Sequence, residues 1–321
     1  MPRATAPAVL AAALALFAAA TVAGCGGSGA ARSAAPSAPP STAARTPSPS
    51  GPAARPPALC GRLRARVTGR VADPAANELS GLVQSRSQPG LLWSHDDSGA
   101  GPVLFGLRAD GRVAARPTVT RAQAVDWEDI AAGPAADGGP LLYIGDIGDN
   151  AARRASIDVY RVAEPRVGAA ATAPAARLQL RYPDGAHDAE AVLVDPLRGD
   201  LVIVTKALGA ARAYRAPARL SAGSQATLRR GPAIALSLVT AGDVSADGRI
   251  VVLRGYDRLA VWVRHGRERL TTTLGRAPCL SPTSLAGEGQ GEAIALDRRG
   301  ATFATVAEGS PAVLRRYTVS R

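Results

Sequence analysis

The chain has 321 residues and a formal net charge of +12, and 46% of its residues are hydrophobic but only 4% are aromatic. Lys206 is the only lysine among 38 basic residues, and no basic cluster is interleaved with aromatic side chains. These features argue against a nucleic-acid-binding surface, so we expect no nucleic-acid partner. The preference for arginine, alanine, glycine and proline instead indicates GC-rich coding, as in actinobacteria.

Residues 1–24 have the pattern of an export signal. Arg3 precedes an apolar run, residues 8–20, which is short for a membrane-spanning helix, and small residues follow it. The sequence Val22-Ala23-Gly24-Cys25 resembles the lipobox of bacterial lipoproteins. This resemblance implies cleavage before Cys25 and acylation of that cysteine, and the alternative is an ordinary signal peptide with a chance cysteine. We therefore expect a lipid anchor in the cell membrane, on its extracytoplasmic face.

Residues 25–59 are predicted to form a disordered tether between the lipid and a folded domain. Between residues 26 and 58 the chain consists almost entirely of Ala, Ser, Pro, Gly and Thr, with three arginines and no acidic residue. Such a composition offers too little apolar surface to offset the entropy of ordering. Residues 60–321 are enough for one sizeable core, and they carry 34 of the 38 basic residues and all 26 acidic ones.

A unit that opens on an acidic residue followed by small and apolar residues recurs five times in this domain, at intervals of 50, 62, 53 and 49 residues. The five copies are Glu78–Leu82, Glu128–Ala131, Glu190–Leu193, Asp243–Ser245 and Glu292–Ala295. The units divide into short strand-like runs separated by turns rich in Gly, Asp, Pro or Arg. This period predicts an all-β fold, a β-propeller with five blades. Six blades are the alternative, if a degenerate blade lies within the 62-residue interval.

The last unit contains only three clear strand-like runs before the chain ends. The run Leu63–Val71 belongs to no unit, so we expect this N-terminal strand to complete the last blade and close the ring. Cys60 precedes that strand and Cys279 precedes the fifth unit. In an oxidising compartment this pair predicts a disulfide that fastens the closure, and a metal site or a reactive thiol is the alternative.

The acidic residues that open the units are candidate metal ligands. In a propeller the innermost strands face a central channel, so these side chains are predicted to form a ring near one mouth. They are Glu78, Glu128, Glu190, Asp243 and Glu292. Converging carboxylates repel one another unless a cation lies among them, and oxygen ligands suit Ca²⁺ or another divalent cation. The alternative is structural: each carboxylate accepts backbone N–H bonds and holds the neighbouring blade.

Polar residues also follow the second strand-like run of each unit, and we expect them on loops at the same face as the ring. The candidate ligand-binding residues are His95, Asp96, Asp97, Asp146, Asp149, Asn150, Lys206, Arg254 and Glu308. His95 could act as a base oriented by Asp96 or Asp97. The chain has no Gly-x-Ser-x-Gly elbow, no His-Glu-x-x-His motif and no glycine-rich phosphate loop.

Several of these segments together resemble a bacterial propeller superfamily. They are Glu78–Leu82 with Leu92–Asp97, Asp126–Ile130 with Tyr143–Asn150, and Gly291–Ala295 with Ala307–Gly309. The superfamily includes the esterase-like phytase domain, the SdiA-regulated propellers and NHL- or lactonase-type proteins. The resemblance implies that Glu78, Glu128, Glu190 and Glu292 belong to a site at the channel mouth.

These patterns favour a monomeric surface lipoprotein that binds an extracellular ligand or protein at a carboxylate-lined mouth with a divalent cation. One alternative is a metal-dependent hydrolase of the lactonase or phosphoesterase kind. The other is a metal-free platform for protein interaction. The sequence favours binding over catalysis, because no catalytic motif is present.

Overall fold

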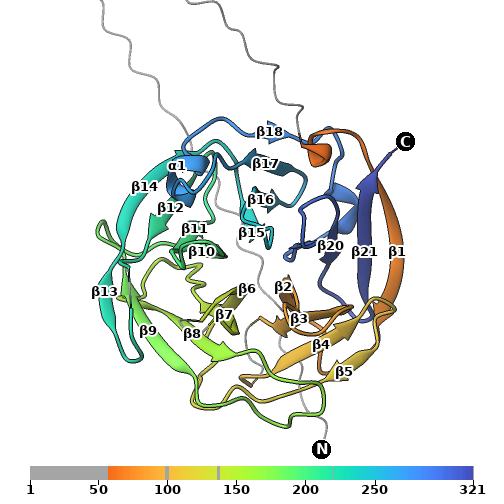
Figure 1. The fold of residues 1–321 in the computed structure, drawn as a ribbon, viewed down its shortest axis with the longest axis horizontal. Helices are drawn as coiled ribbons and strands as arrows, with labels where there is room; N and C mark the ends of the chain where they lie inside the picture. The colour runs from red at the N-terminus through yellow and green to blue at the C-terminus, as the bar shows by residue number, and fades with distance from the viewer. Residues whose placement is uncertain (1–56, 98–100, 136–137, 219, 321) are drawn as a thin grey trace, which may run out of the picture. The chain divides into compact units, whose positions relative to one another are not determined.

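The computed structural model describes residues 57–97, 101–135, 138–218 and 220–320 (Figure 1). The predicted signal peptide, the acylation site Cys25 and residues 25–56 of the predicted tether lie outside these described residues. Among the described residues, no helix has the length and apolar character needed to cross a bilayer.

Five mainly antiparallel sheets form a propeller ring, which confirms the predicted all-β fold with five blades (Figure 1). Blade 1 comprises β2 (Leu79–Gln84), β3 (Leu91–Asp96), β4 (Leu104–Arg108) and β5 (Val113–Ala115). Blade 2 comprises β6 (Trp127–Pro134), β7 (Pro140–Asp146), β8 (Ile157–Ala163) and β9 (Ala176–Arg181). Blade 3 comprises β10 (Ala189–Val194), β11 (Leu201–Thr205), β12 (Ala211–Arg215) and β14 (Arg229–Ile234).

Blades 4 and 5 complete the ring. Blade 4 comprises β15 (Val239–Val244), β16 (Ile250–Gly255), β17 (Leu259–Val263) and β18 (Cys279–Leu280), with the short helix α1 (Leu270–Leu274) before β18. Blade 5 comprises β19 (Ala295–Leu296), β20 (Phe303–Val306), β21 (Ala312–Val319) and β1 (Leu63–Val71). The 3₁₀ turns η1 (Ala58–Cys60) and η2 (Ala286–Glu288) precede β1 and β19.

Blade 5 contains strands from both ends of the described chain. β1 pairs antiparallel with β21, from Leu63 opposite Val319 to Val71 opposite Ala312, with a bulge between Val67 and Gly69. A Cβ atom on Gly69 would lie 2.1 Å from the carbonyl carbon of Asp110, so only glycine lets this strand touch the turn of blade 1.

The predicted disulfide between Cys60 and Cys279 is confirmed, with 5.8 Å between the Cα atoms. Cys60 ends η1, immediately before β1, and Cys279 begins β18. The bond therefore joins the segment that enters blade 5 to the outermost strand of blade 4.

The core is divided among the interfaces between blades. The described residues form five apolar clusters, and each combines side chains of two neighbouring blades. The inner strands β10 and β15 are buried along their whole length, because neighbouring blades cover both of their faces. In contrast, most of β1 and β14, at the outside, is exposed or half-buried.

A fifth strand extends blade 2. β13 (Gln225–Thr227) comes from the connection between β12 and β14 of blade 3, yet it pairs in parallel with β9 of blade 2. Gln225 lies opposite Gln179, and Thr227 lies opposite Arg181. The outer edges of blades 2 and 3 are therefore joined by main-chain hydrogen bonds.

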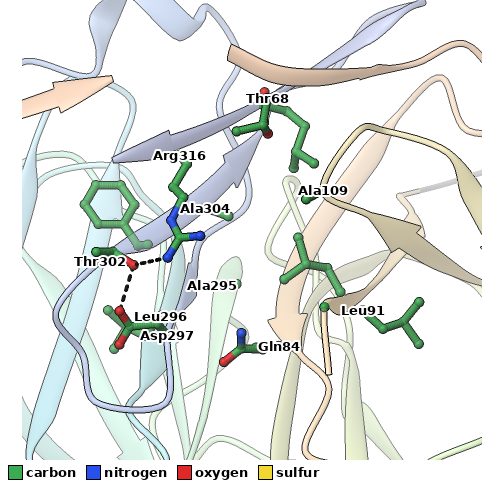
Figure 2. A pocket seen from close by; sticks show the side chains of 14 residues that line it. Thr68, Gln84, Leu91, Ala109, Ala295, Leu296, Asp297, Thr302, Ala304 and Arg316 are labelled. Atoms are coloured by element: carbon green, nitrogen blue, oxygen red, sulfur yellow. Dashed lines mark hydrogen bonds between the residues drawn. The ribbon is translucent and has the colours of Figure 1, made fainter. Parts of the chain in front are cut away.

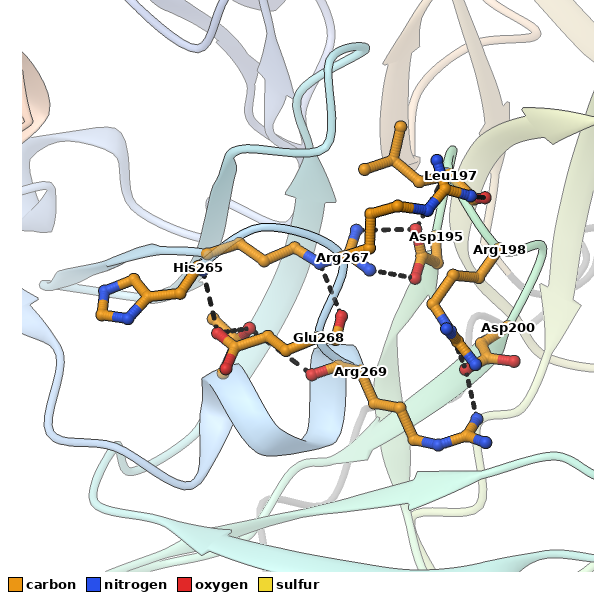
Figure 3. Close-up of polar contacts among 10 residues, drawn as sticks. Asp195, Leu197, Arg198, Asp200, His265, Arg267, Glu268 and Arg269 are labelled. Carbon is orange, nitrogen blue, oxygen red and sulfur yellow. Dashed lines mark hydrogen bonds and ion pairs between the residues drawn. The ribbon is translucent and has the colours of Figure 1, made fainter.

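Blades 3 and 4 are also joined by a buried ion pair (Figure 3). Arg264 donates from Nη1 and Nη2 to the two carboxylate oxygens of Asp195, at 2.7 and 2.6 Å, and both side chains are fully buried. Beside it, Arg269 donates to Asp200 at 2.8 Å. Two parallel N–H···O bonds fix the relative orientation of the two side chains.

Candidate functional site

A backbone bulge sets the register of the first strand in four blades. The pairing shifts between Ser80 and Val83, Trp127 and Asp129, Ala189 and Ala191, and Val239 and Ala241. In each blade, one residue at or before the start of the first strand lies opposite the end of the second strand. These equivalent residues are Leu79, Trp127, Ala189, Val239 and Gly291. The next residues, which share one position around the channel, are Ser80, Glu128, Glu190, Thr240 and Glu292.

The observed ring position therefore holds three carboxylates rather than the five expected from the sequence. Ser80 and Thr240 take the other two places, and their hydroxyls donate to the carbonyl oxygens of Glu128 at 2.7 Å and Gly291 at 2.9 Å. Glu78 lies two residues earlier, where it is exposed, and Asp243 lies three residues later. The acidic motifs look alike in sequence, but the bulges place them in different registers.

Asp243 holds the neighbouring blade, as the structural alternative anticipated. Its carboxylate accepts N–H bonds from Val244 and from Leu296 of blade 5, both at 2.7 Å. Asp129, which sequence reasoning missed, does the same between blades 2 and 3 through Val192 at 2.8 Å. Burial raises the pKa of Asp243 to about 6 and raises the pKa of Asp129 well above its ordinary value, against the effect of these hydrogen bonds.

Three carboxylates at the mouth could hold a metal ion. One oxygen from each of Asp97, Asp126 and Glu128 lies within 4.8 Å of the others. Asp97 follows β3, Asp126 precedes β6 and Glu128 lies in β6, so blades 1 and 2 both contribute. Asp126 was not predicted as a ligand. The signal that could have found it is its spacing, because it stands two residues before the ring position, as Glu78 does in blade 1.

Gly148 lies directly against this cluster. A Cβ atom at residue 148 would lie 2.2 Å from Oε1 of Glu128 and 2.5 Å from Oδ2 of Asp126. The space beside the two carboxylates therefore exists only because residue 148 has no side chain.

The electrostatics of the mouth disfavour ionisation of its carboxylates. Burial, together with the charges of Glu190 and Asp97, raises the pKa of Glu128 to about 11. Burial, followed by the charges of Asp126 and Glu292, raises the pKa of Asp97 to about 7. Without a cation, the cluster therefore retains protons at neutral pH.

Lys206 and Tyr256 occupy the other side of the mouth. Lys206 forms an ion pair with Glu190, and its Nζ lies 5.5 Å from the centroid of the Tyr256 ring. The Tyr256 hydroxyl donates to Oε1 of Glu292 at 3.1 Å. Oε2 of Glu190 is buried and accepts no hydrogen bond from the described residues.

The structure places Asp97, Lys206 and Glu308 beside the ring position at the channel mouth, where the sequence predicted them. Their N–H groups donate to the carbonyl oxygens of Glu78, Asp188 and Gln290, which precede the ring position by two residues. Burial, together with a hydrogen bond to Glu292 and its charge, raises the pKa of Glu308 to about 8. For Glu190, burial outweighs the ion pair with Lys206 and raises the pKa to about 8.

His95, Asp96 and Arg254 have other surroundings. His95 is fully buried edge-on against Trp127, and burial lowers its pKa to about 4. Asp96 is buried and accepts the N–H of Glu78 at 3.3 Å. Arg254 is fully buried and forms an ion pair with Glu288 at 2.7 Å. Its charge is thus already balanced within the protein.

Asp146 and Asp149 organise the loop that carries Gly148. Asp146 is fully buried and forms an ion pair with Arg154 at 2.8 Å. Asp149 accepts the N–H groups of Arg153 at 2.9 Å and Arg154 at 2.7 Å. Asn150, in contrast, is exposed.

A separate pocket of about 140 Å³ lies between blades 5 and 1 (Figure 2). Its buried floor includes Leu91 and Leu296, and at its edge Arg316 donates to Oγ1 of Thr302 at 3.2 Å. None of the residues predicted to bind a ligand or metal lines this pocket.

No protein-family model matches the chain, and no curated protein matches it significantly. The five-bladed propeller therefore rests on the strand pairing itself. Neither comparison supports the resemblance to one particular superfamily, that of the esterase-like phytase and lactonase-type propellers.

Proposed function

We propose that the protein is a lipid-anchored propeller on the extracytoplasmic face of the cell membrane, and that it binds a divalent cation at Asp97, Asp126 and Glu128. Through this site it binds an extracellular ligand or protein partner. The anchor and the location are inferred from residues 1–25, and the cation site is inferred from the geometry of the mouth.

The observation that carries the cation site is the convergence of three carboxylate oxygens within 4.8 Å of one another. Hard divalent cations such as Ca²⁺ take oxygen ligands from carboxylates and fill the remaining positions with water or ligand. A cation at this place would replace the protons that Glu128 and Asp97 otherwise retain. Three protein ligands would leave coordination positions for a bound partner.

Calorimetric titration of the purified protein with Ca²⁺, Mg²⁺ and Mn²⁺, after chelation, tests this proposal. The test variants are Asp126→Asn and Glu128→Gln, and the matched control is Asp257→Asn. Asp257 is exposed and lies outside the cluster, and its side chain pairs with Arg258.

Saturable binding that is lost in both test variants and kept in the control is the expected result. Absence of binding by all three metal ions, with an unchanged melting temperature, would overturn the cation site. That outcome would favour the metal-free interaction platform.

A second candidate function is metal-dependent hydrolysis of a lactone, ester or phosphoester. Oδ1 of Asp97 favours it, because this oxygen is buried and accepts no hydrogen bond from the described residues. A bound cation would supply a water molecule of lowered pKa. The unpaired Oδ1 of Asp97 would accept the proton from that water.

A screen of esters, lactones and phosphoesters in the presence of the bound metal ion tests this candidate. We expect Asp97→Asn to abolish any turnover. No turnover by the wild-type protein in this screen would leave binding as the function.

A further inference from the structure

A pocket between blades 3 and 4 adjoins the mouth. It has a volume of about 440 Å³, within the usual range for small-molecule sites. Its lining includes Leu236, Leu238, Leu280 and Tyr256, together with Asp257 and Arg258, which pair with each other. Leu236 is buried, whereas Leu280 is 44% exposed at the opening.

Tyr256 is the wall that the pocket shares with the mouth. Tyr256 lines the pocket, and its hydroxyl donates to Glu292, one of the three carboxylates at the ring position. The register places Tyr256 directly after β16, as Asp97 follows β3. A ligand in the pocket would therefore have the carboxylates of the mouth within reach.

The backbone and side chains around the pocket opening are unusual. Leu238 has a φ angle of 50°, which a leucine rarely adopts, and its N–H donates to the carbonyl of Ala207 at 2.9 Å. Strained residues of this kind cluster at ligand sites. Next to Ala207, Leu208 is 84% exposed, the highest value among the exposed large hydrophobic residues of the described chain.

We propose that this pocket holds the apolar body of a small organic ammonium compound, whose charged head lies among the mouth carboxylates beside Glu292. The inference deepens the proposed function and rests on it in one respect, because carboxylates of the same mouth would attract both the divalent cation and the ammonium head. It adds the chemical class of the ligand and a second contact surface.

The carboxyl groups of the mouth favour an ammonium head over an anionic one, because they can release a proton when a cation binds beside them. Glu190 is 2% exposed and its Oε2 has no hydrogen-bond partner among the described residues, so a donor is missing there. Lys206 shows how this environment accepts an ammonium group, because its Nζ pairs with Glu190 and faces the Tyr256 ring. An apolar body that continues from such a head would enter the pocket past the same ring.

Binding of three probes to the full chain tests the proposal. 2-Phenylethylamine has both the head and the body, ethylamine has only the head, and 2-phenylethanol has the body without the charge. We expect 2-phenylethylamine to bind at least about tenfold more tightly than either of the others, because it alone buries the apolar ring and pairs the charge.

A variant that fills the pocket separates the contribution of the apolar body to the affinity from that of the ammonium head. Ser237 is exposed and lines the pocket, so Ser237→Trp should reduce the affinity for 2-phenylethylamine to that of ethylamine and leave ethylamine unchanged. The matched control is Ser221→Trp, at an exposed serine outside the pocket. Equal effects of the two variants would overturn the assignment of the pocket.

The two proposals fail in different ways. A protein that selects 2-phenylethylamine but binds none of the three divalent metal ions supports the pocket and overturns the metal site. A protein that binds Ca²⁺ but does not distinguish 2-phenylethylamine from ethylamine overturns the pocket. Equal binding of 2-phenylethanol and 2-phenylethylamine overturns the ammonium head.

Discussion

Replacing Glu128 with glutamine should stabilise the cation-free protein. Burial and the neighbouring carboxylates raise the pKa of Glu128 to about 11, against an ordinary value of 4.5. The folded state therefore keeps a proton that the unfolded state releases above pH 4.5. The contribution of this group to the free energy of unfolding is largest below that pH and falls as the pH rises towards the folded pKa.

The magnitude follows from this difference. Each pH unit between the two pKa values costs about 1.4 kcal/mol, so the wild-type protein loses about 3 kcal/mol from this carboxyl between pH 4.5 and pH 7. Glu128→Gln keeps the shape of the side chain without the proton release. For a domain of this size, about 3 kcal/mol corresponds to a rise in Tm of roughly 6–12 °C at pH 7.

Thermal melts of the wild type and of Glu128→Gln from pH 5 to pH 8, after chelation, measure the effect. The difference in Tm should grow with pH and should shrink or reverse when Ca²⁺ is added, because about 2.7 kcal/mol of stability is gained at a concentration 100-fold above Kd. A variant that melts below the wild type at every pH without cation would refute the reasoning. So would a difference in Tm that does not depend on pH.

Three further predictions concern other parts of the fold. Asp195→Asn leaves the buried Arg264 without its carboxylate, so denaturant melts should show a loss of about 3–5 kcal/mol, and a loss below about 1 kcal/mol would contradict the role of this pair. Gly148→Ala places a Cβ atom 2.2 Å from Glu128, so calorimetry should show at least about tenfold weaker Ca²⁺ binding with little change in Tm. Replacing Cys60 and Cys279 with serine should cost about 3–5 kcal/mol, as seen by comparing melts with those of the oxidised wild type, and equal melts would contradict it.

The fold was predictable because the repeat spacing is a coarse signal. The interval of about fifty residues, together with strand-like runs, favoured five blades over six without requiring any exact register. The disulfide was also predictable, because only Cys60 and Cys279 remained once Cys25 was assigned to lipid.

The composition of the site was less predictable, because it depends on single-residue register. A bulge of one residue decides which side chain reaches the channel, and Glu78 and Asp243 resemble Glu128 in sequence without sharing its position. Arg254 shows a second limit. Its partner Glu288 is 34 residues away and precedes the fifth unit, so no local pattern reveals that its charge is already paired.

The strand β13 has a consequence for how such a ring could change during evolution. A propeller can gain or lose a whole blade when the gene is duplicated or deleted at a boundary between two blades. Here a cut between blades 2 and 3 would separate β9 from the strand that covers its outer edge, because β13 belongs in sequence to blade 3. The edge of blade 2 would then present unpaired N–H and C=O groups to other chains. Blades 2 and 3 are therefore expected to be inherited as a pair, and the boundary between them is a poor place for an exchange of modules.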